Sequence, residues 1–129
     1  MKFDIGKTIN YWMEGAFYDI KTADALLKTK RYPYVLFFGH LALEKILKAL
    51  VVKESKKHVP YTHSLPLLSS KLPFITEEVR KKLAGFMEFY LESRYPEERK
   101  SFYKKCTKKF TENSLKEIKE VFRWLKKKL

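Results

Sequence analysis

Apolar residues recur every three or four positions in the first part of the chain. They are Ile9, Trp12, Met13, Ala16, Phe17, Ile20, Ala23 and Leu27. This spacing places them on one face of an α-helix, where side chains three and four positions apart are neighbours. The pattern predicts a helix over residues 8–28, with Thr8 as the side chain that caps its first turn.

A second predicted helix, over residues 34–53, is apolar on nearly every side. Pro33 suits its first turn, where a backbone N–H is not needed. A helix that is apolar all round is typical of the centre of a bundle. His40, Glu44 and Lys48 interrupt the apolar pattern at intervals of four, and therefore share one face.

Residues 54–75 contain three prolines and four serines, which predicts a long connection with one short helix over residues 64–71. Thr76, followed by two glutamates, predicts the start of a third helix. This helix is expected to end before Pro96, because the residue before a proline is disfavoured in helical conformation.

The remaining segment predicts a fourth helix, because Ser114 and Glu117 fit a capping box followed by an amphipathic run. Residues 97–110 are expected to be helical as well. No segment has the alternating pattern of a strand. The fold class predicted is therefore all-α, an up-and-down bundle of four main helices plus one or two short helices, in a single domain over residues 1–129.

Charge adds a preference for anionic partners. The chain has a net charge of +13, and residues 94–129 hold 13 Lys and Arg against five acidic residues. Such a field favours RNA, DNA, nucleotides or an acidic protein, although a solvated lysine-rich surface has the same composition. The absence of Gln and the abundance of Lys and Glu are typical of heat-adapted proteins, which favours a thermophilic source.

The residues that several kinds of functional site require are missing from the sequence. The single cysteine, Cys106, forms no internal disulfide and is expected to pack as a small apolar side chain. His58 and His63 have no further metal ligand at a suitable spacing, so no metal site is expected. A Gly-rich phosphate loop is missing and no cofactor is expected. With neither a membrane-length apolar stretch nor a signal peptide, the expected location is the cytoplasm.

The His40, Glu44 and Lys48 stripe has two interpretations. It could be an internally satisfied set that anchors the bundle, or it could line a binding groove. His63 is expected to hold the loop through a hydrogen bond or a capping contact.

A second candidate lies at the end of the predicted third helix. Tyr90 and Arg94, four residues apart, are expected to share a helix face, with Tyr95 beside them. Arg99, beyond Pro96, could bind a phosphate together with Arg94. A ring beside a guanidinium can stack a base and hold a phosphate. Alternatively, Arg94 packs on Tyr90 and bonds the last helical carbonyls.

Four segments in order resemble the HEPN domain family. They are AFYDIKTA at 16–23, RYPYVLFFGHLALEKILKAL at 31–50, THSL at 62–65 and YLESRYP at 90–96. The resemblance implies an up-and-down bundle of four main helices, commonly homodimeric, in a family associated with nucleotides and RNA. Many relatives are ribonucleases or toxins, and many others are encoded beside a minimal nucleotidyltransferase protein.

The resemblance also assigns positions. Asp19 matches the acidic position of the family's first helix, Glu44 and Lys48 match the core of the second, and His63 matches the histidine of its H-x-L loop. Ribonuclease members carry an Arg followed four to six residues later by His, whereas no His follows Arg94 in this chain. Proton transfer near neutral pH thereby loses its usual carrier.

The sequence therefore favours a non-catalytic, homodimeric HEPN-like domain that binds nucleotide or RNA, or pairs with a minimal nucleotidyltransferase protein. The candidate binding residues are His40, Glu44, Lys48, Tyr90, Arg94, Tyr95 and Arg99. Two alternatives stay open. One is a metal-independent ribonuclease that uses Arg94 with Glu97 or Glu98, and the other is a pure protein-interaction module.

Overall fold

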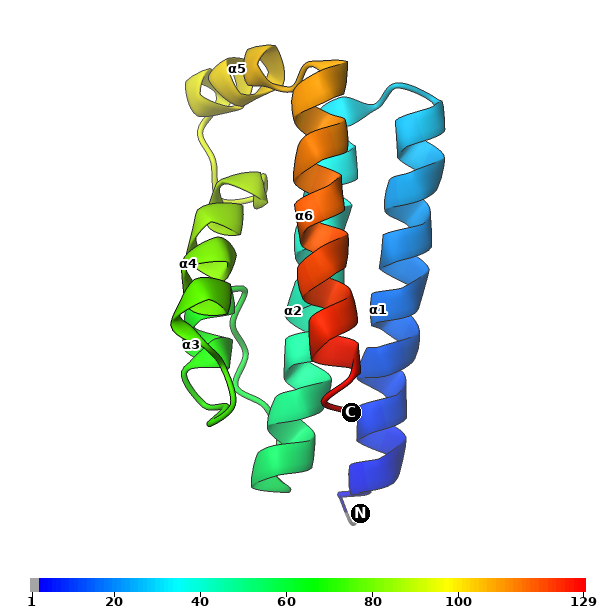
Figure 1. Cartoon of the computed structure of the whole chain (residues 1–129), viewed down its shortest axis with the longest axis vertical. Helices are drawn as coiled ribbons and strands as arrows, with labels where there is room; N and C mark the ends of the chain where they lie inside the picture. Colours follow the sequence, from blue (N-terminus) through cyan, green and yellow to red (C-terminus); the bar gives the residue numbers. More distant parts are fainter. Residues whose placement is uncertain (1–2) are drawn as a thin grey trace.

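The computed structural model describes residues 3–129, and within this range it contains helices and connecting loops but no strand. The elements follow in the order α1 (Ile5–Lys28), α2 (Tyr32–Ser55), α3 (Leu65–Ser69), α4 (Glu77–Gly85), the 3₁₀ helix η1 (Phe86–Phe89), α5 (Pro96–Lys105) and α6 (Lys108–Lys126). The long helices α1 and α2 are antiparallel, α5 lies across one end of the bundle, and α6 runs along α2 (Figure 1). The all-α prediction is confirmed.

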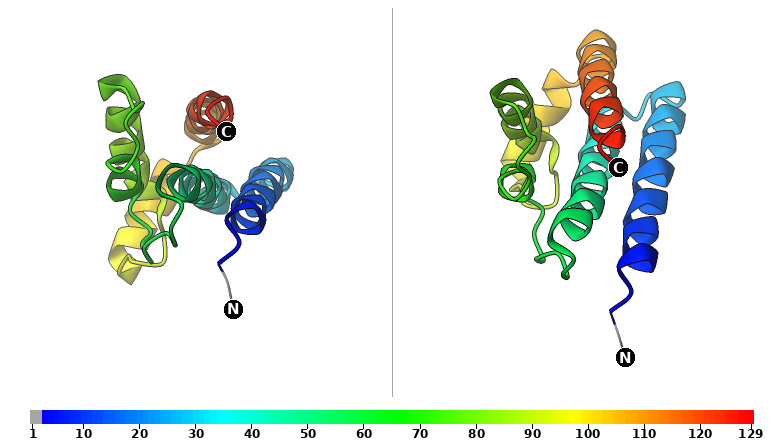
Figure 2. Two further views of the ribbon diagram at one scale, coloured as in Figure 1. Left: turned by 90° about the horizontal axis from the view of Figure 1, so that it is seen from below. Right: turned by 60° about the horizontal axis from the view of Figure 1, so that its bottom comes forward.

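Helix α2 lies at the centre, with α1, α6 and the α3–α4 segment around it (Figure 2). Of its 24 residues, 15 are buried, which matches a sequence that is apolar nearly all round. Each fully buried leucine, such as Leu43 or Leu47, stabilises the fold by about 1.5–3 kcal/mol relative to an exposed position. The polar stripe on this helix is consequently held in the interior.

The start of α1 differs from the prediction. The helix begins at Ile5, and the Oδ1 atom of Asp4 accepts a hydrogen bond from the backbone N–H of Lys7 at 2.9 Å. Thr8, predicted to cap, instead donates its hydroxyl to the carbonyl of Asp4 at 2.7 Å. An aspartate is a strong cap because its charge also interacts favourably with the helix dipole.

Two later predictions are confirmed. A short helix, α3, lies inside the predicted 64–71 segment and is capped by Ser64, whose Oγ accepts the N–H of Leu67 at 3.1 Å. Thr76 caps α4 by accepting the N–H of Val79 at 3.2 Å.

The third helix is shorter than predicted. Helix α4 ends at Gly85 and continues as the 3₁₀ helix η1, in which the rings of Phe86 and Phe89 stack at 5.8 Å. Residues three apart eclipse one another in a 3₁₀ helix, so this geometry buries both rings together. Tyr90 and Arg94 lie beyond η1, and the prediction that they share a helix face is wrong.

The prediction of a capping box at Ser114 is also wrong. Helix α6 begins at Lys108, where the Thr107 hydroxyl accepts the N–H of Phe110 at 3.2 Å. Ser114 lies inside the helix on its buried face. The predicted helical segment 97–110 is divided by a break at Cys106 into the end of α5 and the start of α6.

Close packing of α2 against α6 leads to a first prediction. A Cβ atom added at Gly39 would lie 2.8 Å from Cδ1 of the buried Ile118, whereas one added at Gly85 would meet nothing within 4 Å. We expect Gly39→Ala to lower the free energy of unfolding by about 1 kcal/mol, because overpacking outweighs the gain in helix propensity. Gly85→Ala is the matched control and should raise it by about 0.5 kcal/mol. Urea unfolding of both variants measures the free energy of unfolding. A change of the same sign in the two variants would contradict the prediction.

Candidate functional site

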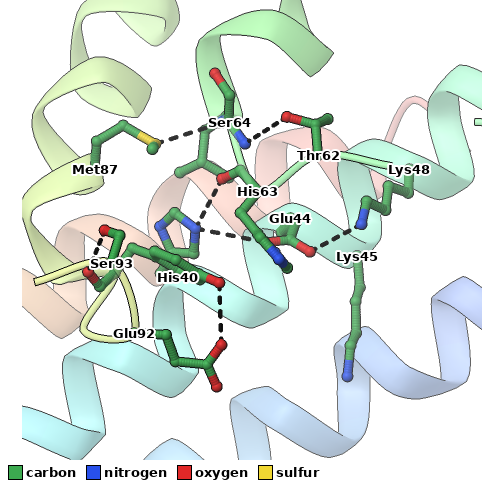
Figure 3. A network of polar contacts seen from close by, with 12 residues as sticks. His40, Glu44, Lys45, Lys48, Thr62, His63, Ser64, Met87, Glu92 and Ser93 are labelled. Atoms are coloured by element: carbon green, nitrogen blue, oxygen red, sulfur yellow. Dashed lines mark hydrogen bonds and ion pairs between the residues drawn. The ribbon is translucent and has the colours of Figure 1, made fainter. Parts of the chain in front are cut away.

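Five side chains from three parts of the chain meet beside the centre of α2, and we refer to them as the polar cluster. Helix α2 contributes His40, Glu44 and Lys48, the loop before α3 contributes His63, and the segment after η1 contributes Tyr90. Figure 3 shows the histidines and Lys48 converging on Glu44. The helical spacing of four explains the first three residues, because it stacks them along one side of α2.

The Glu44 carboxylate is the hub of the polar cluster. Its Oε2 atom accepts a hydrogen bond from Nζ of Lys48 at 2.9 Å, and its Oε1 atom accepts one from Nδ1 of His63 at 3.0 Å. The second contact joins α2 to the loop before α3. One carboxylate thus fixes both its own helix face and a segment 19 residues away.

His40 reinforces this junction. Its Nε2 atom donates to the backbone carbonyl of His63 at 3.1 Å, because a carbonyl can only accept, and it also lies 3.6 Å from Oε1 of Glu44. The His40 ring is fully buried and its Nδ1 atom has no partner within the described part of the chain. The loop before α3 is therefore held by two imidazoles, one through its side chain and one through its backbone.

These contacts set the ionisation of the hub. Burial alone would raise the pKa of Glu44, but the nearby imidazole of His40, the hydrogen bonds from Lys48 and His63, and the charge of Lys48 outweigh it and lower that pKa to about 2. The carboxylate is consequently ionised at neutral pH and stays so well into the acid range.

Tyr90 closes the polar cluster from the side of η1. Its ring stacks on His63 with centroids 4.7 Å apart and lies 5.1 Å from the ring of His40. Its hydroxyl donates to Glu92 at 3.1 Å. Burial, with the neighbouring Glu92 carboxylate, raises the pKa of Tyr90 to about 12, so the phenol stays neutral. It therefore acts here as a buried ring that packs on the histidines.

Burial separates the two interpretations of the stripe. His40 is 0% exposed and Glu44 and Lys48 are each 4% exposed, so a ligand has almost no access to them. The Lys48 ammonium also lies 4.9 Å above the ring of Trp12 on α1. This geometry favours the anchoring interpretation, and binding by these three residues stays a prediction.

The other candidate residues lie elsewhere. Arg94 is in the turn before α5 and has one ion-pair partner among residues 3–129, Glu98, at 3.6 Å. Tyr95 is 76% exposed, and Arg99 lies on α5. Within the described residues, no hydrogen bond or ion pair joins these three to the polar cluster, so the structure does not bring the candidates together in one site.

Asp19, at the family's acidic position, is part of a separate helix contact. Its Oδ2 atom lies 2.7 Å from Nζ of Lys45, which joins α1 to α2. The stem of Lys45 passes Gly15, where an added Cβ would lie 3.0 Å from it. The glycine thus gives the lysine room to reach the aspartate.

The structure assembles a cationic surface from two distant segments. The turn from α1 to α2 lies at the same end of the bundle as α5 and the start of α6 (Figure 1), and the rings of Tyr34 on α2 and Tyr103 on α5 are 6.4 Å apart. We call this surface the basic end. Its cations are Lys28, Lys30, Arg31, Arg99, Lys100, Lys104, Lys105, Lys108 and Lys109. Residues 25–43 and 99–111, which supply them, contain no acidic residue.

The positive charge of residues 94–129 was evident from the sequence, but the basic end as a surface was not predicted. Lys105 is neutralised by Glu88 at 2.9 Å, while eight further cations of the basic end have no ion-pair partner among residues 3–129. Tyr34 and Tyr103 are each 42% exposed among them. The acid-free segments were a usable signal, but only the fold places the turn after α1 beside α5.

Three further features were sought among residues 3–129: a metal site, a reactive thiol and a membrane-spanning helix. No group of three or more His, Cys, Asp or Glu side chains is placed to hold a metal ion. Burial raises the pKa of the Cys106 thiol to about 12, with Glu88 contributing, so its thiolate is scarce at neutral pH. No helix in this range is long and apolar enough to cross a membrane.

The helix order, with α2 at the centre and the polar cluster beside it, describes an all-α bundle, and the comparisons identify its family. The HEPN domain model matches residues 9–129, so the chain belongs to this family. The crystal structure of TT1696 from Thermus thermophilus is similar, with a TM-score of 0.77, 22% identity, and coverage of 94% of this chain and 98% of that one. This likeness shows the shared fold. Among curated proteins, none matches. Family membership supports a function related to nucleotides or RNA.

Proposed function

We propose that this chain binds RNA through the basic end of its bundle and does not cleave it. The observation that carries the proposal is the basic end itself, in which acid-free segments from both halves of the chain meet. Lys and Arg that neutralise phosphates release condensed counterions, and this release dominates the affinity for nucleic acids. The family's association with nucleotides and RNA points the same way.

Two features favour an RNA strand over a single nucleotide. The cations are spread over the turn after α1, the length of α5 and the first turn of α6, which suits several successive phosphates. Tyr34 and Tyr103 offer half-exposed rings on which bases can stack without sequence preference. HEPN domains commonly dimerise, and a homodimer would present two basic ends. Pairing with a minimal nucleotidyltransferase protein stays a prediction.

The absence of cleavage is proposed from the arrangement of the imidazoles. No His follows His63 in the sequence, and His63 is committed to Glu44 and packed on Tyr90. His40 is fully buried. The third histidine, His58, packs on Phe3 with ring centroids 3.9 Å apart. Among residues 3–129 no hydrogen bond joins an imidazole to Arg94, so the usual carrier of a proton at neutral pH has no contact with this guanidinium.

The binding proposal is tested with fluorescein-labelled single-stranded RNA of mixed sequence, titrated with the protein at increasing salt. We expect binding at low salt and a linear fall of log affinity with log salt. Absence of binding at the lowest salt, with the protein folded by circular dichroism, would reject the proposal.

The ribonuclease alternative has one observation in its favour. Arg94 and Glu98 line a cavity of about 270 Å³ together with Ser101 and Lys105, so a guanidinium and a carboxylate do meet. Incubation of end-labelled RNA with the wild-type protein and with Arg94→Ala decides the matter. We expect no cleavage by either protein. Cleavage by the wild type that Arg94→Ala loses would establish the alternative.

A further inference from the structure

Four cations of helix α6 lie along one of its flanks. The flank toward α1 carries Lys116, Lys119, Arg123 and Lys126, which line hollows between the two helices. The flank toward α4 carries Glu120, which lines a different hollow. The flank toward α1, although Glu112 also lies on it, is therefore the more cationic of the two and the more favourable for an anionic partner.

The hollows on the α1 side form one groove. They measure about 250 and 280 Å³ and share Asp24, Lys119 and Arg123. Both α1 and α6 pack on α2, and they run alongside each other in Figure 1. On α1 the lining extends from Phe17 to Leu27, a rise of about 15 Å. We call this feature the α1–α6 groove.

The α1–α6 groove has an apolar floor and a cationic wall. Phe17 and Phe122 meet edge to face at 5.7 Å, and Ile20 lies beside them. Lys119 is paired with Asp24 at 2.5 Å. The other three cations of the wall, Lys116, Arg123 and Lys126, have no carboxylate within ion-pair distance among residues 3–129.

We propose that the α1–α6 groove binds an acidic amphipathic helix of about three turns from a protein partner. The apolar face of such a helix would cover the half-buried Phe17, Ile20 and Leu27. Its carboxylates would meet Lys116, Arg123 and Lys126 along one edge, where opposite charges fix register and speed association. This interaction is separate from RNA binding at the basic end.

The groove suits a helix better than an RNA strand. Nζ of Lys126 lies 5.2 Å over the ring of Phe17, which leaves less of that ring for a base to stack on. The other half-buried apolar residues of the lining, Ile20 and Leu27, are aliphatic and offer no ring at all. Asp24 is paired with Lys119, and Glu112 also lines the groove, so the cationic charge of the groove is lower than that of the basic end. The segments of the basic end contain no acidic residue.

The test uses a fluorescein-labelled, amidated peptide of about four helical turns with Leu and Phe on one face and Glu on the other. Its control is a peptide of the same composition in scrambled order, which keeps the charge but removes the apolar face. Fluorescence anisotropy at low salt should show binding of the amphipathic peptide, with the scrambled peptide at least tenfold weaker.

Two variants separate this surface from the RNA surface. Arg123→Glu combined with Lys126→Glu changes exposed side chains, so it should fold normally, lose peptide affinity at least tenfold and keep RNA affinity within about threefold. Lys100→Glu combined with Lys104→Glu at the basic end should do the reverse. If the peptide results hold while RNA fails to bind, only the function proposed above is lost.

Three outcomes would overturn the proposal. If the scrambled peptide bound with the same affinity as the amphipathic peptide, charge attraction alone would explain the binding. If Arg123→Glu with Lys126→Glu lowered the RNA affinity as much as the peptide affinity, the groove would be part of the nucleic-acid surface. A change of mass in analytical ultracentrifugation on introducing Arg123→Glu with Lys126→Glu would show that a second copy of the chain covers it.

Discussion

Replacing Glu44 by glutamine should lower the free energy of unfolding by about 3 kcal/mol, roughly 10 °C in Tm. The variant keeps the shape of the side chain but removes the charge that compensates the buried ammonium of Lys48, 2.9 Å away. The amide also turns one of its donors toward Lys48 or His63, which are themselves donors. Urea unfolding at pH 7 measures the difference.

The effect should depend on pH in a specified direction. The pKa of Glu44 is lowered from 4.5 to about 2 in the folded chain, so the unfolded chain takes up this proton first as the pH falls. The stability that Glu44 contributes is therefore fully present above about pH 4.5 and is lost as the pH falls toward 2. Wild type and Glu44→Gln should converge over that interval. A difference that grew on acidification would contradict the assignment.

Two controls identify the cause. Glu88→Gln makes the same chemical change in an ion pair of the same 2.9 Å length, but between exposed side chains, and should lower stability by less than about 1 kcal/mol. Glu44→Gln combined with Lys48→Met removes both buried charges, and should recover a large part of the loss. A double variant no more stable than the single one would show that the His63 contact, and not the ion pair, supplies most of the effect.

The sequence predicts features that depend on neighbouring residues better than features that depend on contacts between distant segments. Helical periodicity is local, so α1, α2 and the amphipathic part of α6 were predicted from spacing alone. The capping box at Ser114 failed because Ser114 is buried on the face of α6 that packs on α2, and the helix begins about two turns earlier at the Thr107 cap. The end of the third helix failed because burial of Phe86 and Phe89 outweighed helix continuation.

The candidate site shows the same division. The spacing of His40, Glu44 and Lys48 predicted a shared face, but whether that face was buried depended on His63 and Tyr90, which reach it from other segments. The anchoring and groove interpretations were therefore indistinguishable before the fold was known. The basic end required the fold for the same reason, since residues about 70 positions apart in sequence form it together.

Removing three cations of the basic end should weaken RNA binding about 100-fold at low salt. We suggest Arg31→Ser, Lys104→Ser and Lys108→Ser together, because all three are exposed and come from the turn after α1, from α5 and from α6. The slope of log affinity against log salt should fall by about 2, near 0.7 for each lost phosphate contact with a single strand. Fluorescence anisotropy at several salt concentrations gives both quantities.

A matched triple variant separates location from net charge. Lys57, Lys71 and Lys127 are also exposed, and they follow the ends of α2, α3 and α6, which lie away from α5 in the lower part of Figure 1. Their replacement by serine lowers the net charge by the same three units. If the protein attracted RNA only through its total charge, both triple variants would lose affinity equally, and the basic end would have no special role. A local surface instead predicts that the control keeps its affinity within about threefold and keeps its salt slope, because the phosphate contacts that release counterions remain.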